Sequence, residues 1–129
     1  MPTLADLGAP TESSTQTAIM QILQYYQNMG KLYYLRNNTG AYASSYKNKM
    51  GEDKTRFIHF GRFGAADLLV FFKRGHTEFW EIKSIKGSLS KGQFEFKEFM
   101  GNLGYIYRVF RSADEAEKVI AEQLKISGC

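Results

Sequence analysis

The chain has 129 residues, enough for one domain with its own core, and its 43% hydrophobic content is usual for a globular protein. No apolar run approaches the roughly 18 residues needed to cross a membrane, and residues 1–10 do not read as a signal peptide. Cys129 is the only cysteine, which excludes an internal disulfide and a cysteine metal cluster and favours a reducing, cytoplasmic setting. The formal charge of +4 is compatible with a polyanionic partner but only modestly favours one.

The first half of the chain contains one strong helical pattern. We expect a flexible arm at residues 1–10 and a single domain at 11–129. The predicted elements of this half are a helix at 11–29, a strand at 31–36, a long irregular loop at 37–54 and a strand at 55–61. The helix is predicted because apolar residues recur at steps of three and four, and Gly30 ends it.

The second half begins with a predicted β-hairpin, with strands at 67–72 and 77–84 that are apolar on both faces. Such strands belong in the middle of a sheet that is covered on both sides. A helix follows from Ser90, with Gln93 completing a capping box and Phe96, Phe99, Met100 and Leu103 as its buried stripe. A strand at 105–111 and a helix after Ser112, capped with Glu115 and burying Ala116, Val119 and Ile120, complete the chain.

The expected fold is therefore α/β, with a mixed central sheet between helices and the order α-β-β-β-α-β-α. The last strand follows a helix, so we expect it to pair parallel to its neighbour.

Three charged residues interrupt the apolar hairpin, namely Asp67, Glu81 and Lys83. Buried charges are costly, and chains usually carry them to hold a metal and perform chemistry. Glu81 and Lys83 share a face of their strand because side chains alternate. A two-residue loop at Arg74-Gly75 would turn Asp67 away from them. A three-residue loop, which adds His76, would pair Asp67 with Lys83 and bring all three together. The metal-site interpretation therefore predicts an odd-length loop or a bulge.

Two carboxylates are the ligands that a hard cation such as Mg²⁺ or Mn²⁺ prefers. Lys83 could orient or deprotonate a water, or stabilise charge on phosphorus. The backbone carbonyl of Ile82 is a further candidate ligand, and Gln93 could hold Lys83 or a phosphate oxygen. The alternatives are an ordinary strand-entry Asp67, a simple Glu81–Lys83 ion pair and a Gln93 that only caps its helix. We expect His76 to be a solvated turn residue.

Two basic segments could contact a nucleic acid. The first interleaves Tyr42 and Tyr46 with Arg36, Lys47, Lys49, Lys54, Arg56 and Arg62, and either contacts phosphates and bases or is a solvated loop. The second, at 84–91 with Lys86 and Lys91, adjoins the acid-acid-lysine set and is the better candidate for phosphate contact.

Several motifs in this order resemble the VRR-NUC (virus-type replication-repair nuclease) branch of the PD-(D/E)xK nucleases, over residues 12–120. They are Arg36-Asn37-Asn38-Thr39-Gly40, Gly64-Ala65-Ala66-Asp67, Glu81-Ile82-Lys83-Ser84, Gly87-Ser88-Leu89-Ser90 and Gln93. The resemblance implies a restriction-endonuclease-like core in which Asp67 and Glu81 bind metal, Lys83 is catalytic and Gln93 supports them. It also implies a first-helix glutamate at the metal, for which Glu12 is the candidate. The DNA contacts expected are Arg36, Asn37, Lys86, Ser88, Ser90 and Lys91.

Small stand-alone proteins of this family resemble phage or bacterial Holliday junction resolvases, which act as dimers. The resemblance thus implies a metal-dependent endodeoxyribonuclease that cuts branched DNA as a homodimer, in the cytoplasm of a bacterial or phage-infected cell. The alternatives are a flap-type or sequence-specific nuclease of the same fold, a non-catalytic nucleic-acid-binding module, and a structural or partner-binding domain.

Overall fold

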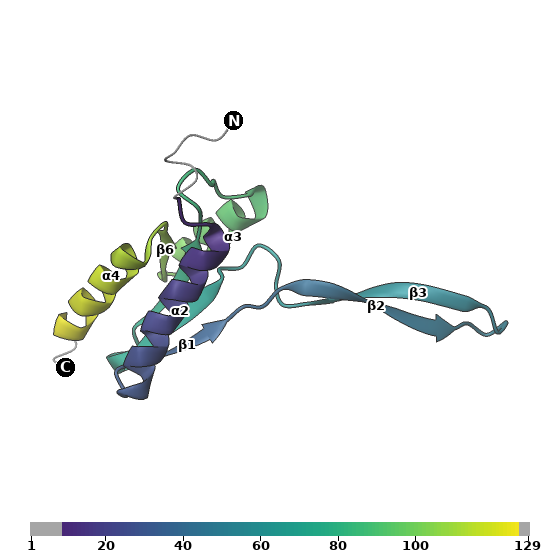
Figure 1. The fold of residues 1–129 in the computed structure, drawn as a ribbon, viewed down its shortest axis with the longest axis horizontal. Helices are drawn as coiled ribbons and strands as arrows, with labels where there is room; N and C mark the ends of the chain where they lie inside the picture. The colour runs from purple at the N-terminus through teal and green to yellow at the C-terminus, as the bar shows by residue number, and fades with distance from the viewer. Residues whose placement is uncertain (1–8, 127–129) are drawn as a thin grey trace.

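The computed structural model describes residues 9–126, which form a compact body and a long protruding arm (Figure 1). The flexible N-terminal arm expected at residues 1–10 is a different segment from the protruding arm, and it falls almost entirely outside the described residues. The elements are α2 (Glu12–Asn28), β1 (Leu32–Arg36), β2 (Gly40–Lys47), β3 (Asp53–Phe60), β4 (Leu68–Phe72), the 3₁₀ turn η1 (Lys73–Gly75), β5 (Thr77–Ile82), α3 (Lys91–Asn102), β6 (Ile106–Phe110) and α4 (Ala113–Ile126). Within residues 9–126, no helix is both long and apolar enough to cross a membrane.

The body is built on a four-stranded sheet with the order β1-β4-β5-β6. The β1–β4 and β4–β5 pairs are antiparallel, whereas β6 runs parallel to β5, as expected for a strand that follows a helix. The body reads α2-β1-β4-β5-α3-β6-α4, which confirms the mixed sheet. The predicted order α-β-β-β-α-β-α holds for the body, whereas the chain as a whole has two further strands, β2 and β3, between β1 and β4. The predicted strand at 55–61 does not belong to this sheet.

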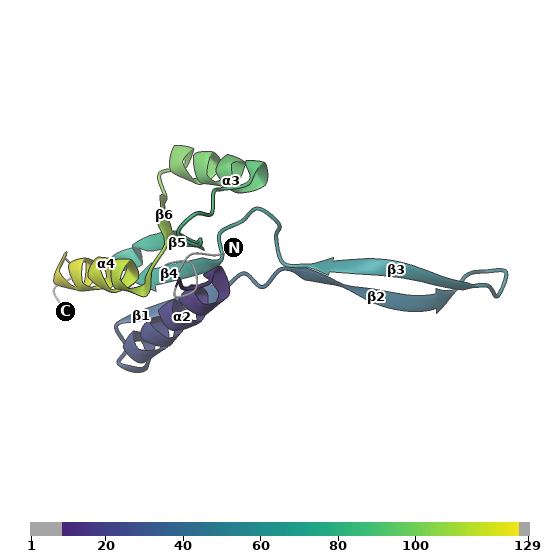
Figure 2. The same cartoon turned by 45° about the horizontal axis from the view of Figure 1, so that its top comes forward.

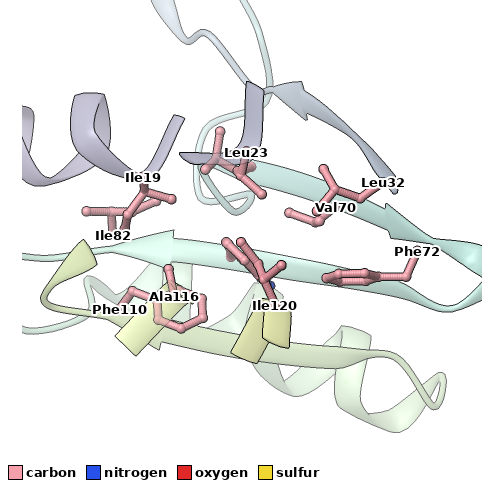
Figure 3. Packing of buried hydrophobic residues seen from close by; sticks show 11 residues of the cluster. Ile19, Leu23, Leu32, Val70, Phe72, Ile82, Phe110, Ala116 and Ile120 are labelled. Carbon is pink, nitrogen blue, oxygen red and sulfur yellow. The ribbon is translucent and has the colours of Figure 1, made fainter. Parts of the chain in front are cut away.

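One face of the sheet carries the hydrophobic core, under α2 and α4 (Figure 3). The face consists of alternate residues of β4 and β5, and Trp80 packs edge-on against Phe110 with ring centroids 4.5 Å apart. Helix α2 contributes Ile19 and Leu23 from its apolar stripe. The predicted stripe of the last helix is confirmed, because Ala116 and Ile120 are buried and Val119 packs against the cluster. Each fully buried large side chain contributes about 1.5–3 kcal/mol.

The opposite face is covered by α3, which lies on the other side of the sheet from α2 and α4 (Figure 2). Phe96 reaches the sheet and packs edge-on against Phe79 at 5.3 Å. The predicted buried stripe of this helix is wrong, because none of its four residues is fully buried. Phe96 and Met100 are half-buried, whereas Phe99 is 64% and Leu103 is 58% exposed. The reason is that α3 packs on the sheet without a neighbouring helix, whereas α2 and α4 also pack against each other. Only one edge of the apolar stripe of α3 therefore meets the sheet.

The arm is an antiparallel hairpin of β2 and β3, separate from the central sheet. It corrects the prediction of an irregular loop at 37–54, because residues 40–47 form a regular strand. The turn is closed by the Asn48 side chain, which accepts from the backbone N–H groups of Met50 and Glu52 at 3.0 Å each. The strand escaped prediction because almost all of its side chains are exposed on both faces, so its sequence shows no apolar alternation.

Candidate active site

The β4–β5 hairpin brings two acids directly opposite each other. The register pairs Leu68 with Trp80, and continuing it by one residue places Asp67 across from Glu81. The turn between the strands has three residues, Lys73–Gly75, with Arg74 in the left-handed region at φ 65°. The predicted odd-length loop is confirmed. Its position is corrected, because the turn begins one residue earlier than expected and Asp67 therefore opposes Glu81 rather than Lys83.

Asp67 is held between its two neighbouring strands. Its Oδ2 accepts a hydrogen bond from the backbone N–H of Ile82 at 2.8 Å. Its carbonyl oxygen accepts from the backbone N–H of Asn37, also at 2.8 Å. The first bond fixes the carboxylate against β5 beside Glu81, which an ordinary strand-entry residue would not require.

Glu81 is a buried carboxylate with only part of its charge compensated. The residue is 1% exposed, its Oε1 lies 4.0 Å from the Lys83 ammonium, and its Oε2 has no hydrogen-bond partner among the described residues. Burial and the nearby Asp67 charge raise the pKa of Glu81 to about 8, although Lys83 acts in the opposite direction. An ionised Glu81 therefore calls for a further positive charge at this position.

Gln93 joins the helix cap to the acid pair. Its Oε1 accepts from the backbone N–H of Ser90 at 2.8 Å, and its own backbone N–H donates to the Ser90 hydroxyl, which completes the predicted capping box. Its Nε2 donates to Glu81 Oε1 at 2.8 Å. One amide thus completes the cap and also contacts the Glu81 carboxylate, rather than Lys83. The supporting role of Gln93 in catalysis stays a prediction.

Lys83 follows directly after β5 and lies in the same buried region. Its backbone N–H donates to the Phe110 carbonyl at 2.9 Å, which continues the β5–β6 ladder by one residue. The side chain is buried on the face that it shares with Glu81. A lysine ammonium beside a carboxylate pair can stabilise a phosphate or hold a water.

The donor set fits a divalent cation. Glu81 Oε2 is a buried oxygen without a hydrogen-bond partner in the described part of the chain, and Asp67 adds a second carboxylate beside it. Hard cations such as Mg²⁺ take carboxylates, carbonyls and waters, so Asp67, Glu81 and the Ile82 carbonyl would hold one. Glu12 is exposed at the start of α2, and within residues 9–126 no three His, Cys, Asp or Glu side chains are grouped as metal ligands. The structure does not bring Glu12 to the pair, and its role as a ligand stays a prediction.

A cavity of about 410 Å³ opens beside Asp67 and Gln93. Its wall also includes Asn37 and Ser90, two of the predicted DNA contacts. The Asn37 side chain is already occupied, because it donates to the Arg62 carbonyl at 2.9 Å and accepts from the Arg62 N–H at 3.1 Å. The remaining predicted contacts, Arg36, Lys86, Ser88 and Lys91, are all exposed.

Two residues near the site were not anticipated. The Tyr107 hydroxyl is buried without a hydrogen-bond partner among the described residues, and burial together with Glu81 and Asp67 raises its pKa. Arg111 donates from Nη1 to the carbonyls of Ser84 and Gly87 at 2.6 Å each, which fastens the loop that carries Lys86 and Ser88. Neither the burial of Tyr107 near the acids nor the contacts of Arg111 has a local sequence signal, because both depend on how β6 lies beside β5.

Glu78, on the opposite face of β5, shows what a compensated buried acid looks like. Burial alone would raise its pKa, but the pKa is lowered overall by hydrogen bonds from Arg108, His76 and Trp80. The Arg108 Nε and the His76 Nε2 each lie 2.7 Å from the carboxylate. The prediction that His76 is a solvated turn residue is therefore wrong, because it is half-buried against Glu78.

Comparison with known proteins identifies the fold of this chain. No family model matches the sequence, and no curated protein matches it. Among solved structures, a chain described as "VRR_NUC domain" superposes with a TM-score of 0.56 at 19% identity, covering 87% of this chain and 97% of the other. The chain therefore has the VRR-NUC fold, in agreement with the resemblance of its motifs.

Proposed function

We propose that this chain is a metal-dependent DNA endonuclease that hydrolyses phosphodiester bonds in branched DNA, as a Holliday junction resolvase. The observation that carries the proposal is the meeting of Asp67, Lys83 and Gln93 at the buried Glu81 carboxylate, whose Oε2 has no hydrogen-bond partner within residues 9–126. The likeness of the fold to a VRR-NUC domain supports the same activity.

Asp67, Glu81 and the Ile82 carbonyl would hold Mg²⁺ or Mn²⁺, which polarises the scissile phosphate and lowers the pKa of a bound water. Gln93 orients Glu81 through its 2.8 Å hydrogen bond. Lys83 presents a positive charge on the same face, where it orients the attacking water and stabilises charge that develops on phosphorus. The cavity beside Asp67 admits the DNA backbone.

The substrate and the assembly follow from the resemblance to resolvases. A four-way junction has two-fold symmetry, so a homodimer would present two sites to two strands of like polarity. The net charge of +4 supports a polyanionic partner.

The test is cleavage of a labelled four-way junction beside linear duplex, single-stranded and flap DNA, with Mg²⁺, with Mn²⁺ and with EDTA. Paired cuts confined to the junction, abolished by EDTA and by Asp67→Asn, are expected. The exposed acid Glu122 provides a matched control, because Glu122→Gln should cut like the unaltered chain. Unchanged cleavage by Asp67→Asn would refute the site, and cutting of flaps alone would refute the junction preference.

A further inference from the structure

The two faces of the arm differ in chemistry. The β2–β3 register places Tyr42 opposite Ile58, Ser44 opposite Arg56, and Tyr46 opposite Lys54, and these alternate pairs share one face. We call this the tyrosine face; it contains no acidic residue. The other face carries Ala43 opposite Phe57, and its cation Lys47 is paired with Asp53 at 3.5 Å. The tyrosine face therefore carries two tyrosines with Arg56 and Lys54, whereas the opposite face carries Phe57, His59 and a lysine that is paired with an acid of the same face.

The tyrosine face is open to solvent and partly organised in advance. Tyr42 is 54% and Tyr46 is 43% exposed. The Arg56 guanidinium lies over the Tyr46 ring, 5.3 Å from its centroid. Lys54 forms a 3.5 Å surface pair with Glu52 of the turn, a kind of contact that contributes little. Isolated two-stranded hairpins are only marginally stable in water, so an arm of this length gains from a ligand that covers it.

We propose that the tyrosine face binds unpaired bases of the DNA substrate, with Tyr42 and Tyr46 as stacking platforms and Arg56 as a phosphate contact. Exposed aromatic rings beside a cation are the recurring means of holding single-stranded nucleic acid, because every base offers a π-face. This inference rests on the proposed nuclease function and names the feature of the substrate that the arm reads.

Charge favours DNA over a second copy of the chain as the occupant. Two tyrosine faces packed on each other about a two-fold axis would set Arg56 and Lys54 of one copy against the same cations of the other. A polyanion meets no such repulsion. The opposite face, with its small residues and Phe57, has no comparable positive charge.

The root of the arm joins it to the active site. Asn37 and Arg62 are tied by two side-chain hydrogen bonds, and both lie in the segments that connect the arm to the body. Gly61 packs so tightly there that an added Cβ would lie 2.6 Å from the Asn38 carbonyl oxygen. Eight residues per strand give an arm of about 26 Å, which exceeds the width of a duplex. The arm extends away from the body (Figure 1). Because the Asn37 N–H at its root donates to the Asp67 carbonyl, DNA held at Asp67 would meet the arm at its root.

The experiment measures DNA binding by fluorescence anisotropy in EDTA, with single-stranded, forked and blunt duplex oligonucleotides of equal length. The double variant Tyr42→Leu/Tyr46→Leu keeps apolar bulk but removes the rings, and it should lose about tenfold or more in affinity for single-stranded and forked DNA. Blunt duplex should be affected less than threefold. Tyr42→Phe/Tyr46→Phe keeps the rings and should bind like the unaltered chain. Arg56→Gln should lower the salt slope for single strands by about 0.7.

The matched control is Phe57→Leu on the opposite face, which should leave DNA affinity unchanged. Equal affinity of the leucine and phenylalanine pairs for forked DNA would overturn the proposal. So would a loss of dimer mass in light scattering by the leucine pair, which would assign the face to a second copy. If the leucine pair binds normally while Asp67→Asn abolishes cutting, the arm proposal fails and the nuclease stands. If the unaltered chain binds no DNA, both fail.

Discussion

Gln93 Nε2 lies 2.8 Å from Glu81 Oε1, although the two residues belong to different elements and are separated by twelve positions. The other end of the same amide closes the cap of α3 through the Ser90 N–H. The first turn of α3 therefore sets the orientation of the buried carboxylate.

Gln93 caps α3 and contacts Glu81, and comparing its replacement with that of Ser90, which only caps the helix, should separate these two roles. Gln93→Ala loses half of the cap and the bond to Glu81, so we expect a loss of about 1–2 kcal/mol in the free energy of unfolding. We also expect a smaller rise in melting temperature on addition of Mg²⁺. Ser90→Ala should cost about 1 kcal/mol through the cap and keep the full response to Mg²⁺. Thermal melts with and without Mg²⁺ check both, and equal Mg²⁺ responses would contradict the role of Gln93.

Glu81 should make the metal-free protein less stable as pH rises. Its pKa is raised to about 8 from an ordinary value near 4.5, so the unfolded chain releases the proton first and stability falls between these values. Glu81→Gln removes this dependence and should stabilise the metal-free protein at pH 8 by on the order of 1–3 kcal/mol. It should also abolish stabilisation by Mg²⁺. Urea unfolding at pH 5 and pH 8 measures the difference, and a variant less stable than the unaltered chain at pH 8 would contradict the assignment.

Glu78 should respond in the opposite sense. Burial is outweighed by the hydrogen bonds from Arg108, His76 and Trp80, so its pKa is lowered, and its contribution is present above the ordinary value and lost as pH falls below it. Glu78→Gln should cost about 3 kcal/mol at pH 7, because Arg108 loses its carboxylate partner. Addition of Mg²⁺ should still raise the melting temperature of the Glu78→Gln variant, because Glu78 lies on the opposite face of β5 from Glu81. Urea unfolding at pH 7 and pH 4 tests this, and a neutral effect at pH 7 would refute it.

Arg111 should matter through the loop that it fastens. Arg111→Ala removes the two 2.6 Å hydrogen bonds to the Ser84 and Gly87 carbonyls. We expect faster amide hydrogen exchange at 84–88 and about tenfold slower cleavage, because Lys86 and Ser88 would lose their fixed position. Arg111→Lys, which cannot reproduce the forked geometry, should be intermediate. Unchanged exchange in the loop would show that the clamp is not needed.

The sequence predicts elements whose signals are local. The cap residues of α3, the apolar steps of α2 and α4 and the two-faced apolar strands β4 and β5 are all found where expected. It was also predictable that Asp67 and Glu81 lie on the same face of the hairpin if the turn has an odd number of residues. The residue opposite Asp67 was not, because it depends on Arg74 adopting a left-handed conformation that favours glycine.

Other features could not be derived from the chain alone. The strand at 40–47 has solvent on both faces, so no burial pattern marks it. Glu78 depends on Arg108, thirty positions later, and looks like any polar residue of a half-exposed strand. The exposure of Phe99 follows from the presence of only one layer beneath α3, which is a property of the whole fold rather than of the helix.

The arm is an insertion between β1 and β4, two strands that are hydrogen-bonded neighbours in the sheet. Among the side chains that the structure describes, none of the buried core residues comes from it, and its root is closed by Asn37 and Arg62. The hairpin can therefore lengthen, shorten or change its surface in the course of evolution without disturbing the acid pair. If the proposed roles hold, changes in the arm would alter the choice of target and leave the residues of the acid pair unchanged.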